Sequence, residues 1–177
     1  MPTDVLARAR RVRLLTCDVD GVLTDGRIYV DDHGHETTAF SALDGVGIGL
    51  LQRAGITVAW ITGSSAPAVT HRAHRLNVSH VVLGAAEKLA PWDALRRQLA
   101  LEAAECAHIG DDLPDLPIFH ACGFAVTVPH APPTVREHAQ FVTARDGGAG
   151  AVRELADLIL AAQGRHADAS VPPPRSA

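Results

Sequence analysis

Lysine is nearly absent from this sequence of 177 residues, whose 16 basic side chains are 15 arginines and a single lysine, Lys88. A chain that uses arginine for generic surface cations is expected to place its one lysine where a compact, flexible point charge is needed. The alternative is that Lys88 is simply a solvated residue on a helix surface.

Patterns that would identify several other classes of protein are missing as well. Three cysteines, an odd number in apolar surroundings, are typical of core thiols in a reducing compartment rather than of a disulfide framework. The sequence has no Cys/His spacing typical of zinc sites and no Gly-x-x-x-x-Gly-Lys-Ser/Thr phosphate loop. It also has no visible repeat or linker.

Charge and hydropathy argue against nucleic-acid and membrane partners. A formal net charge of −4 provides no positive field for either. No apolar run reaches the roughly 18 residues of a membrane span. Residues 1–13 hold four arginines and lack the apolar core of a signal peptide. We therefore expect a cytoplasmic protein with no nucleic-acid or membrane partner.

The apolar pattern predicts an α/β fold. Short apolar runs alternate with stretches of helical period, which indicates a doubly wound, mostly parallel, Rossmann-like sheet whose ligand site lies at the carboxyl ends of the strands. The expected strands are 13–17, 56–61, 80–83, 107–109 and 124–128, and the expected helices are 46–54, 66–76, 87–100 and 149–163. The length suits one domain over residues 1–165, followed by a Pro-rich, disordered tail at 166–177.

The segment 26–40 has a different pattern. Two short runs of β type flank a polar turn at 31–35 that contains Gly34, so we expect a β-hairpin that protrudes from the sheet. No insertion large enough for a cap domain follows Asp25 or Thr62. Something other than a cap domain must then cover the site.

Carboxylates gather where two of the predicted strands end. Asp18 and Asp20 follow the first apolar run, and Asp111 follows the run at 107–109. Two carboxylates two residues apart suit a nucleophile and a proton shuttle, and a third completes a set of oxygen ligands for Mg²⁺. Thr62 and Gly63, at another strand end, offer a hydroxyl and N–H groups to phosphate oxygens, unless Thr62 is an ordinary turn residue.

Four segments in this order resemble the motifs of the haloacid dehalogenase superfamily of phosphotransferases: Asp18 to Gly26, Thr62, Lys88, and Gly110 to Asp115. From about residue 12 to residue 164, the sequence is most similar to the small capless phosphatases of that superfamily that act on 3-deoxy-D-manno-octulosonate 8-phosphate. Further signs of this subgroup lie at 26–30, 44–48 and 147–154.

The resemblance implies a role for each motif residue. Asp18 would be the nucleophile and Asp20 the general acid and base. Mg²⁺ would be held by three groups: the Asp18 side chain, the Asp20 backbone carbonyl and the Asp111 side chain. The phosphoryl group would be bound by Thr62, Gly63 and Lys88.

The resemblance also implies a homotetramer, in which the hairpins join the subunits and a neighbouring subunit shields each pocket. The alternative is a surface hairpin on a monomer. Asp112 and Asp115 are expected behind the metal ligands or as helix caps. His108 is expected to be a strand histidine without a ligand role.

Cations that the resembled subgroup carries around its pocket are absent here, where the sequence has Thr38, Leu43, Ser64 and Ala149. Because Arg is suited to bidentate carboxylate recognition, a substrate with a free carboxylate is not expected. We expect a small phosphorylated sugar or sugar-like metabolite, with Asp44 and Ser64 in its pocket.

Two alternatives stay open at this point. Another arginine could replace the missing cations, with octulosonate 8-phosphate itself as the substrate; the candidates are Arg27, Arg72 and Arg145. From a different class, the chain could be a non-catalytic oligomerisation module. A scaffold would have no need of the motif residues.

Overall fold

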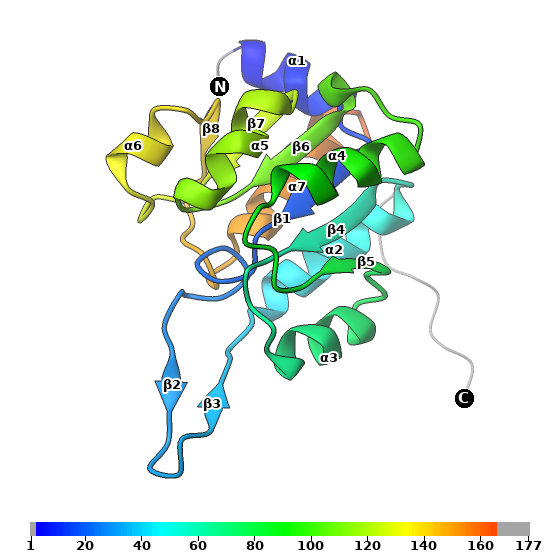
Figure 1. Cartoon of the computed structure of the whole chain (residues 1–177). Coiled ribbons are helices and arrows are strands. Elements are labelled where there is room, and N and C mark those ends of the chain that lie inside the picture. Colours follow the sequence, from blue (N-terminus) through cyan, green and yellow to red (C-terminus); the bar gives the residue numbers. More distant parts are fainter. Residues whose placement is uncertain (1–2, 166–177) are drawn as a thin grey trace, which may run out of the picture.

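A six-stranded parallel sheet forms the centre of the computed structural model, which describes residues 3–165 (Figure 1). The strand order is β5-β4-β1-β6-β7-β8, and every neighbouring pair is parallel. The strands are β1 (Leu14–Cys17), β4 (Thr57–Ile61), β5 (His80–Val82), β6 (Cys106–Ile109), β7 (Phe124–Thr127) and β8 (Phe141–Val142). The predicted doubly wound α/β fold is confirmed, and the tail predicted at 166–177 lies outside the described residues.

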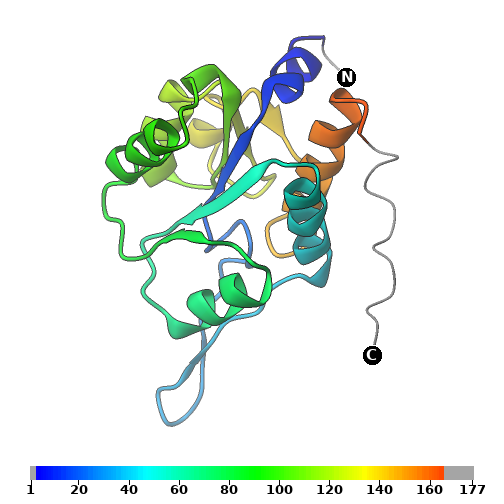
Figure 2. The ribbon, with the colours of Figure 1, turned by 90° about the vertical axis from the view of Figure 1, so that its right-hand side faces the viewer.

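Helices cover both faces of the sheet (Figure 2). One core lies beneath α1 (Thr3–Arg11), α2 (Ala42–Arg53), α3 (Pro67–Arg75) and α7 (Ala151–Ala162). The core on the other face contains Trp92 and Leu95 of α4 (Leu89–Gln98) and Ile118 of α5 (Leu116–Ala121). The shorter elements are the helix α6 (Pro133–Arg136) and the 3₁₀ turns η1 (Ala103–Glu105) and η2 (Leu113–Asp115).

Strand β1 lies in the middle of this arrangement because its side chains are apolar toward both faces. Leu14 packs into the core of α4 and α5, whereas Leu15 and Cys17 pack into the core of α2 and α7. Burial on both faces is the usual condition of a central parallel strand. Since β1 pairs with β4 on one side and β6 on the other, the three strands end side by side.

The predicted hairpin is present and projects from the body of the molecule (Figure 1). It consists of β2 (Tyr29–Val30) and β3 (Glu36–Thr37), which are antiparallel. At its base, the Phe40 ring stacks on Trp60 at 6.2 Å, and the Arg72 guanidinium lies 5.9 Å from the Phe40 ring centre. Within residues 3–165 the hairpin is the insertion between β1 and α2, and no separate cap unit is present.

No helix in the described part of the chain combines the length and the apolar character that a membrane span requires.

Candidate active site

The motif residues from four separate segments meet at the carboxyl edge of the sheet. They line a pocket of about 380 Å³, whose walls are formed by Asp18, Asp20, Thr62, Gly63, Ser64, Ala85, Ala86, Lys88, Asp111, Asp112, Pro114 and Asp115. Asp18 directly follows β1, Thr62 follows β4 and Asp111 comes two residues after β6. Parallel strands bring these ends together, as the sequence pattern requires.

The loop after β1 is held against the loop after β6. The Asp18 N–H donates to the Ile109 carbonyl at 2.9 Å, and Asp18 Oδ1 accepts from the Val19 N–H at 2.7 Å. Gly21 has a φ of +87°, and a Cβ built on it would lie 2.1 Å from Asp111 Oδ2. Only glycine allows this turn to approach the Asp111 carboxylate so closely.

Lys88 is a buried member of the site, with 5% of its surface exposed. Its Nζ lies 2.9 Å from Asp18 Oδ1 and 2.8 Å from Asp115 Oδ1. Burial alone would lower the pKa of this amine, but the two carboxylates raise it, so the ammonium form is retained. The alternative of a solvated surface lysine is wrong.

Asp115 is fully buried and has all its acceptor positions in use. Its Oδ1 accepts from Lys88 and from His108 Nε2 at 2.9 Å. Its Oδ2 accepts from the N–H groups of Asp111 and Asp112, at 3.2 and 3.4 Å. Burial favours the neutral acid, but the hydrogen bond from His108 and the charge of Lys88 outweigh it and lower the pKa of Asp115 to about 2. Asp115 is therefore an anion at neutral pH, and it anchors Lys88.

The other two buried carboxylates are less well compensated. Burial raises the pKa of Asp18 to about 7, with a further contribution from the Asp115 charge that Lys88 only partly opposes. Burial and the Asp115 charge likewise raise the pKa of Asp111 to about 6. A cation placed between Asp18 and Asp111 would favour the ionised form of both carboxylates.

The donor set fits a divalent cation that prefers oxygen ligands. Carboxylate oxygens of Asp18, Asp111 and Asp115 lie within 4.8 Å of one another. Because Asp115 is saturated, Asp18 and Asp111 are the side chains with lone pairs to offer. No donor within residues 3–165 bonds to the Asp20 carbonyl, which leaves a third oxygen. Hard cations such as Mg²⁺ take this kind of ligand.

The remaining pocket residues form tight turns. Thr62 Oγ1 accepts from the Ser64 N–H at 3.0 Å, and Ser64 Oγ accepts from the Ala66 N–H at 3.2 Å. Thr62 is thus a turn residue that also lines the pocket. Asp112 caps η2 by accepting from the Leu113 N–H at 2.8 Å, whereas Asp20 is exposed at the pocket wall.

The structure does not bring Asp44 to this pocket. Its carboxylate is buried, and Oδ1 accepts from the Arg153 N–H at 2.9 Å. Asp44 therefore joins α2 to the first turn of α7. The predicted place of Asp44 in the substrate pocket has no support in this geometry, whereas Ser64 does line the pocket.

Sequence reasoning missed two residues near the site. His108, predicted to be an ordinary strand histidine, bonds to Asp115 and also to Thr16 Oγ1, 2.8 Å from its Nδ1. His130 Nε2 lies 3.8 Å from Asp111 Oδ2. For His108 the signal was a polar side chain in an otherwise apolar strand that ends at the Gly-Asp-Asp motif. His130 lies far along the chain and gave no signal.

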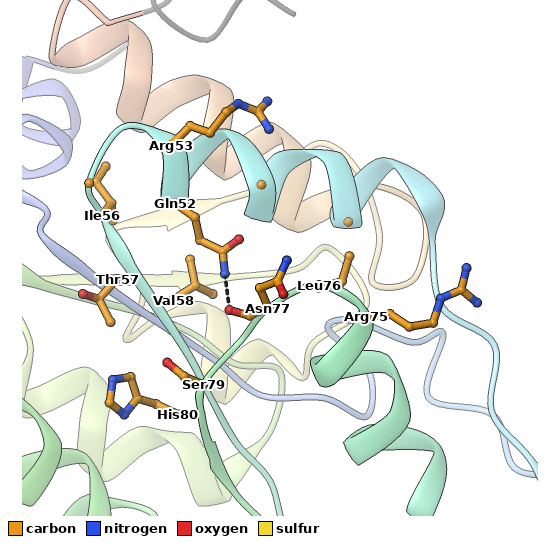
Figure 3. A pocket seen from close by; sticks show the side chains of 13 residues that line it. Gln52, Arg53, Ile56, Thr57, Val58, Arg75, Leu76, Asn77, Ser79 and His80 are labelled. Carbon is orange, nitrogen blue, oxygen red and sulfur yellow. Dashed lines mark hydrogen bonds between the residues drawn. The ribbon is translucent and has the colours of Figure 1, made fainter. Parts of the chain in front are cut away.

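The molecule also has a larger cavity, of about 740 Å³, at the amino ends of β4 and β5 (Figure 3). Gln52 Nε2 crosses it to donate to the Asn77 carbonyl at 3.0 Å, while Arg53 and Arg75 extend away from this pair. No carboxylate and none of the motif residues lines it. Size therefore does not locate the chemistry of this protein.

Comparison with known proteins supports the interpretation of this pocket as an active site. A family model described as haloacid dehalogenase-like hydrolase matches residues 77–155. The 3-deoxy-D-manno-octulosonate 8-phosphate phosphatase of Yersinia pestis is 44% identical over 160 residues, which cover 90% of this chain and 86% of the relative. The chain belongs to the haloacid dehalogenase-like hydrolases. Within them it is a phosphatase, as the sequence motifs predicted.

Solved structures support the same placement of this haloacid dehalogenase-like phosphatase. The octulosonate 8-phosphate phosphatase of Moraxella catarrhalis, in complex with magnesium ion, phosphate ion and a KDO molecule, superposes with a TM-score of 0.92 at 39% identity. That match covers 95% of this chain and 97% of the relative. The cobalt-bound enzyme of Haemophilus influenzae has a TM-score of 0.85 at 39% identity, covering 89% and 92%.

Proposed function

We propose that this phosphatase hydrolyses a small phosphorylated sugar or sugar-like metabolite that lacks a carboxylate. It uses Mg²⁺ and forms an aspartyl phosphate on Asp18. The observation that carries the proposal is the pocket itself, in which a nucleophilic carboxylate, free oxygen ligands and one buried ammonium converge. The metal is supported by the donor set and by the magnesium and cobalt ions named for the two relatives.

The chain's own residues divide the chemistry between them. An oxygen of Asp18 forms a bond to phosphorus as the bond to the leaving alkoxide breaks, and Lys88 neutralises charge on the phosphoryl oxygens. Asp20 gives its proton to the alkoxide and then takes one from the water that hydrolyses the aspartyl phosphate. Bound by Asp18, the Asp20 carbonyl and Asp111, Mg²⁺ would supply further positive charge. Thr62 and Gly63 border the same pocket and bind phosphoryl oxygens.

The lining of the pocket favours a substrate without a carboxylate. Among the described residues of one subunit, Lys88 is the sole cation in the wall, and phosphate binding occupies it. Arg72 does not compensate, because it donates to the Ser41 carbonyl at 3.1 Å and lies over Phe40. Neither Arg27 nor Arg145 lines the pocket. A substrate carboxylate without a cationic partner in this partly desolvated pocket would cost binding energy.

The second candidate is octulosonate 8-phosphate hydrolysis, favoured by the 44% identity to the Yersinia pestis enzyme. A non-catalytic oligomerisation module is not supported, because the complete set of motif residues converges on one pocket.

A panel of phosphorylated sugars, with and without carboxylates, separates the two candidates. We expect a lower kcat/KM for octulosonate 8-phosphate than for at least one ester lacking a carboxylate. Ser64→Arg should then favour the carboxylated ester, by up to about 10-fold for each ~1.4 kcal/mol regained. Preference of the unmodified enzyme for octulosonate 8-phosphate over the whole panel would establish the second candidate instead.

We also propose that the hairpin joins subunits into a tetramer that covers each pocket. Ile28 and Val30 are 76% and 59% exposed, and a hairpin of two-residue strands is marginal on its own. A cytoplasmic location without nucleic-acid or membrane partners stays a prediction.

A further inference from the structure

A buried chain of hydrogen bonds runs behind the pocket, from β1 to β6 and on to Lys88. His108 is fully buried in β6, with Nδ1 2.8 Å from Thr16 Oγ1 and Nε2 2.9 Å from Asp115 Oδ1. Its ring and the Phe119 ring pack in a T-shaped arrangement with centres 5.9 Å apart. These contacts fix the position and the rotation of the imidazole.

The partners of His108 also determine where its proton lies. An ionised carboxylate only accepts, so Nε2 must carry a hydrogen that it donates to Asp115. The Thr16 hydroxyl, which is also 3.2 Å from the Ala107 carbonyl, can serve Nδ1 as a donor or an acceptor. The donation from Nε2 to Asp115 is therefore present in either case.

We propose that His108 is a positioning residue for phosphate capture, because it shares the Asp115 carboxylate with Lys88 and so keeps the ammonium directed at Asp18 and the pocket. This inference rests on the proposed function of the same site. One oxygen, Asp115 Oδ1, receives both donors at nearly equal distance, 2.8 Å from Lys88 and 2.9 Å from His108. Without the imidazole, a buried lone pair would lack a donor, and Lys88 is the mobile donor nearest to it.

The consequence is a shift of Lys88 away from the phosphate position. The ammonium lies 2.9 Å from Asp18 Oδ1, where an incoming phosphoryl oxygen would compete for its hydrogens. If Asp115 draws the ammonium inward, phosphate affinity falls even though the nucleophile and the metal ligands are intact. That pattern differs from a general loss of structure, which would weaken metal and phosphate binding together.

The test is calorimetry of full-length protein with inorganic phosphate at saturating Mg²⁺, together with a Mg²⁺ titration and kcat/KM on the best substrate. We expect His108→Leu to weaken phosphate binding and lower kcat/KM by about 10-fold, the size typical of a lost partner behind a site residue. Mg²⁺ affinity should change less than 3-fold. His108→Gln, whose amide can donate from near the Nε2 position, should recover much of the loss.

Two further variants keep the test decisive if His108→Leu folds poorly. Thr16→Val removes the hydroxyl that holds Nδ1, and it should weaken phosphate binding in the same direction by a smaller factor. Cys106→Ala, a buried change in the same strand but outside the network, should leave phosphate affinity unchanged. Wild-type phosphate affinity in both His108→Leu and Thr16→Val would overturn the positioning role. A wild-type enzyme that binds phosphate but hydrolyses no ester would instead refute the proposed function, and calorimetry would still test His108.

Discussion

Crowding of carboxylates at Asp18, Asp111 and Asp115 sets the properties of the site at the scale of single residues. One ammonium, Lys88, serves two of the three, and Asp115 takes most of the compensation because His108 also donates to it. Asp18 and Asp111 are left with raised pKa values. The site therefore combines a saturated anion, which fixes the lysine, with two unsaturated carboxylates that are available to a cation and to phosphorus.

Replacing Asp18 by Asn tests the nucleophile. An amide cannot form the acyl phosphate and is a weaker metal ligand, so we expect at least a roughly 10³-fold loss of kcat. Steady-state kinetics on the best ester of the panel measures it. Turnover by purified Asp18→Asn protein near the wild-type rate would rule out this nucleophile.

Gly21→Ala tests the close approach of the two loops. The new Cβ would lie 2.1 Å from Asp111 Oδ2 at a φ of +87°, so Asp111 must move. We expect activity to fall by more than about 10-fold and Mg²⁺ activation to need higher concentrations. Gly55→Ala is the matched control, because its φ is +77° and nothing lies within 4 Å. Equal losses in the two variants would assign the effect to backbone strain alone.

At the scale of elements, apolar runs bounded by turns could be predicted from the sequence, whereas the nine-residue, mostly polar helix α1 and the shortest helices could not. Strands β1, β4, β5, β6 and β7 lie within one residue of their predicted limits, because apolar runs bounded by turns are a local signal. The helices α5 and α6, of six and four residues, are too short to show a period. Strand β8 has two residues and depends on its pairing with β7.

In the candidate site, residues with a local sequence signal could be predicted, and residues whose role depends on tertiary contacts could not. The motif aspartates could be predicted because they follow the ends of two apolar strands, Asp18 and Asp20 after β1 and Asp111 after β6. The contact of Asp44 with Arg153 spans 109 residues, and the contact of His108 with Asp115 depends on how η2 folds back. Neither distance is encoded by local spacing, so the sequence placed Asp44 in the pocket and gave His108 no role.

Removing residues 28–38 tests the hairpin as an assembly element. We expect smaller assemblies and lost activity, because the pocket would lose its cover. Ile28→Ser should weaken assembly in the same direction, whereas Val142→Ser, on the exposed face of β8, serves as the control. Light scattering on wild-type protein that gives a monomer at micromolar concentration would exclude the tetramer.

At the scale of the whole molecule, the pocket exists only when the sheet is complete. The chain builds β4 and β5 on one side of β1 before it crosses to β6, β7 and β8 on the other. Asp18 follows β1 and Asp115 follows β6, so the two residues are far apart in the sequence. They meet where the direction of winding of the sheet changes. A ligand that binds both loops must stabilise the entire fold, because neither loop has its shape alone.

The stability of the metal-free protein is therefore expected to depend on pH. The pKa of Asp18 rises from 3.8 to about 7 on folding, and that of Asp111 rises from 3.8 to about 6. Between about pH 4 and pH 7 the folded state therefore binds more protons than the unfolded state. Stability should fall as the pH increases from about 4 to about 7.

Mg²⁺ should raise the melting temperature at pH 8 and have little effect at pH 5, because its ligands must be ionised. Thermal melts in EDTA and in Mg²⁺ measure both; a Mg²⁺ effect that is independent of pH would contradict the assignment.

Because the only lysine is buried in two ion pairs, its chemical reactivity reports how often the active site opens locally. Apart from the N-terminus, Lys88 is the one primary amine in the chain, and it is protonated and enclosed between two carboxylates. An acylating reagent can modify it only during openings that break both contacts. The rate of acylation, measured as the mass increase of the intact protein, would then give the frequency of those openings. Bound phosphate should lower this rate, and the measurement needs no engineered label.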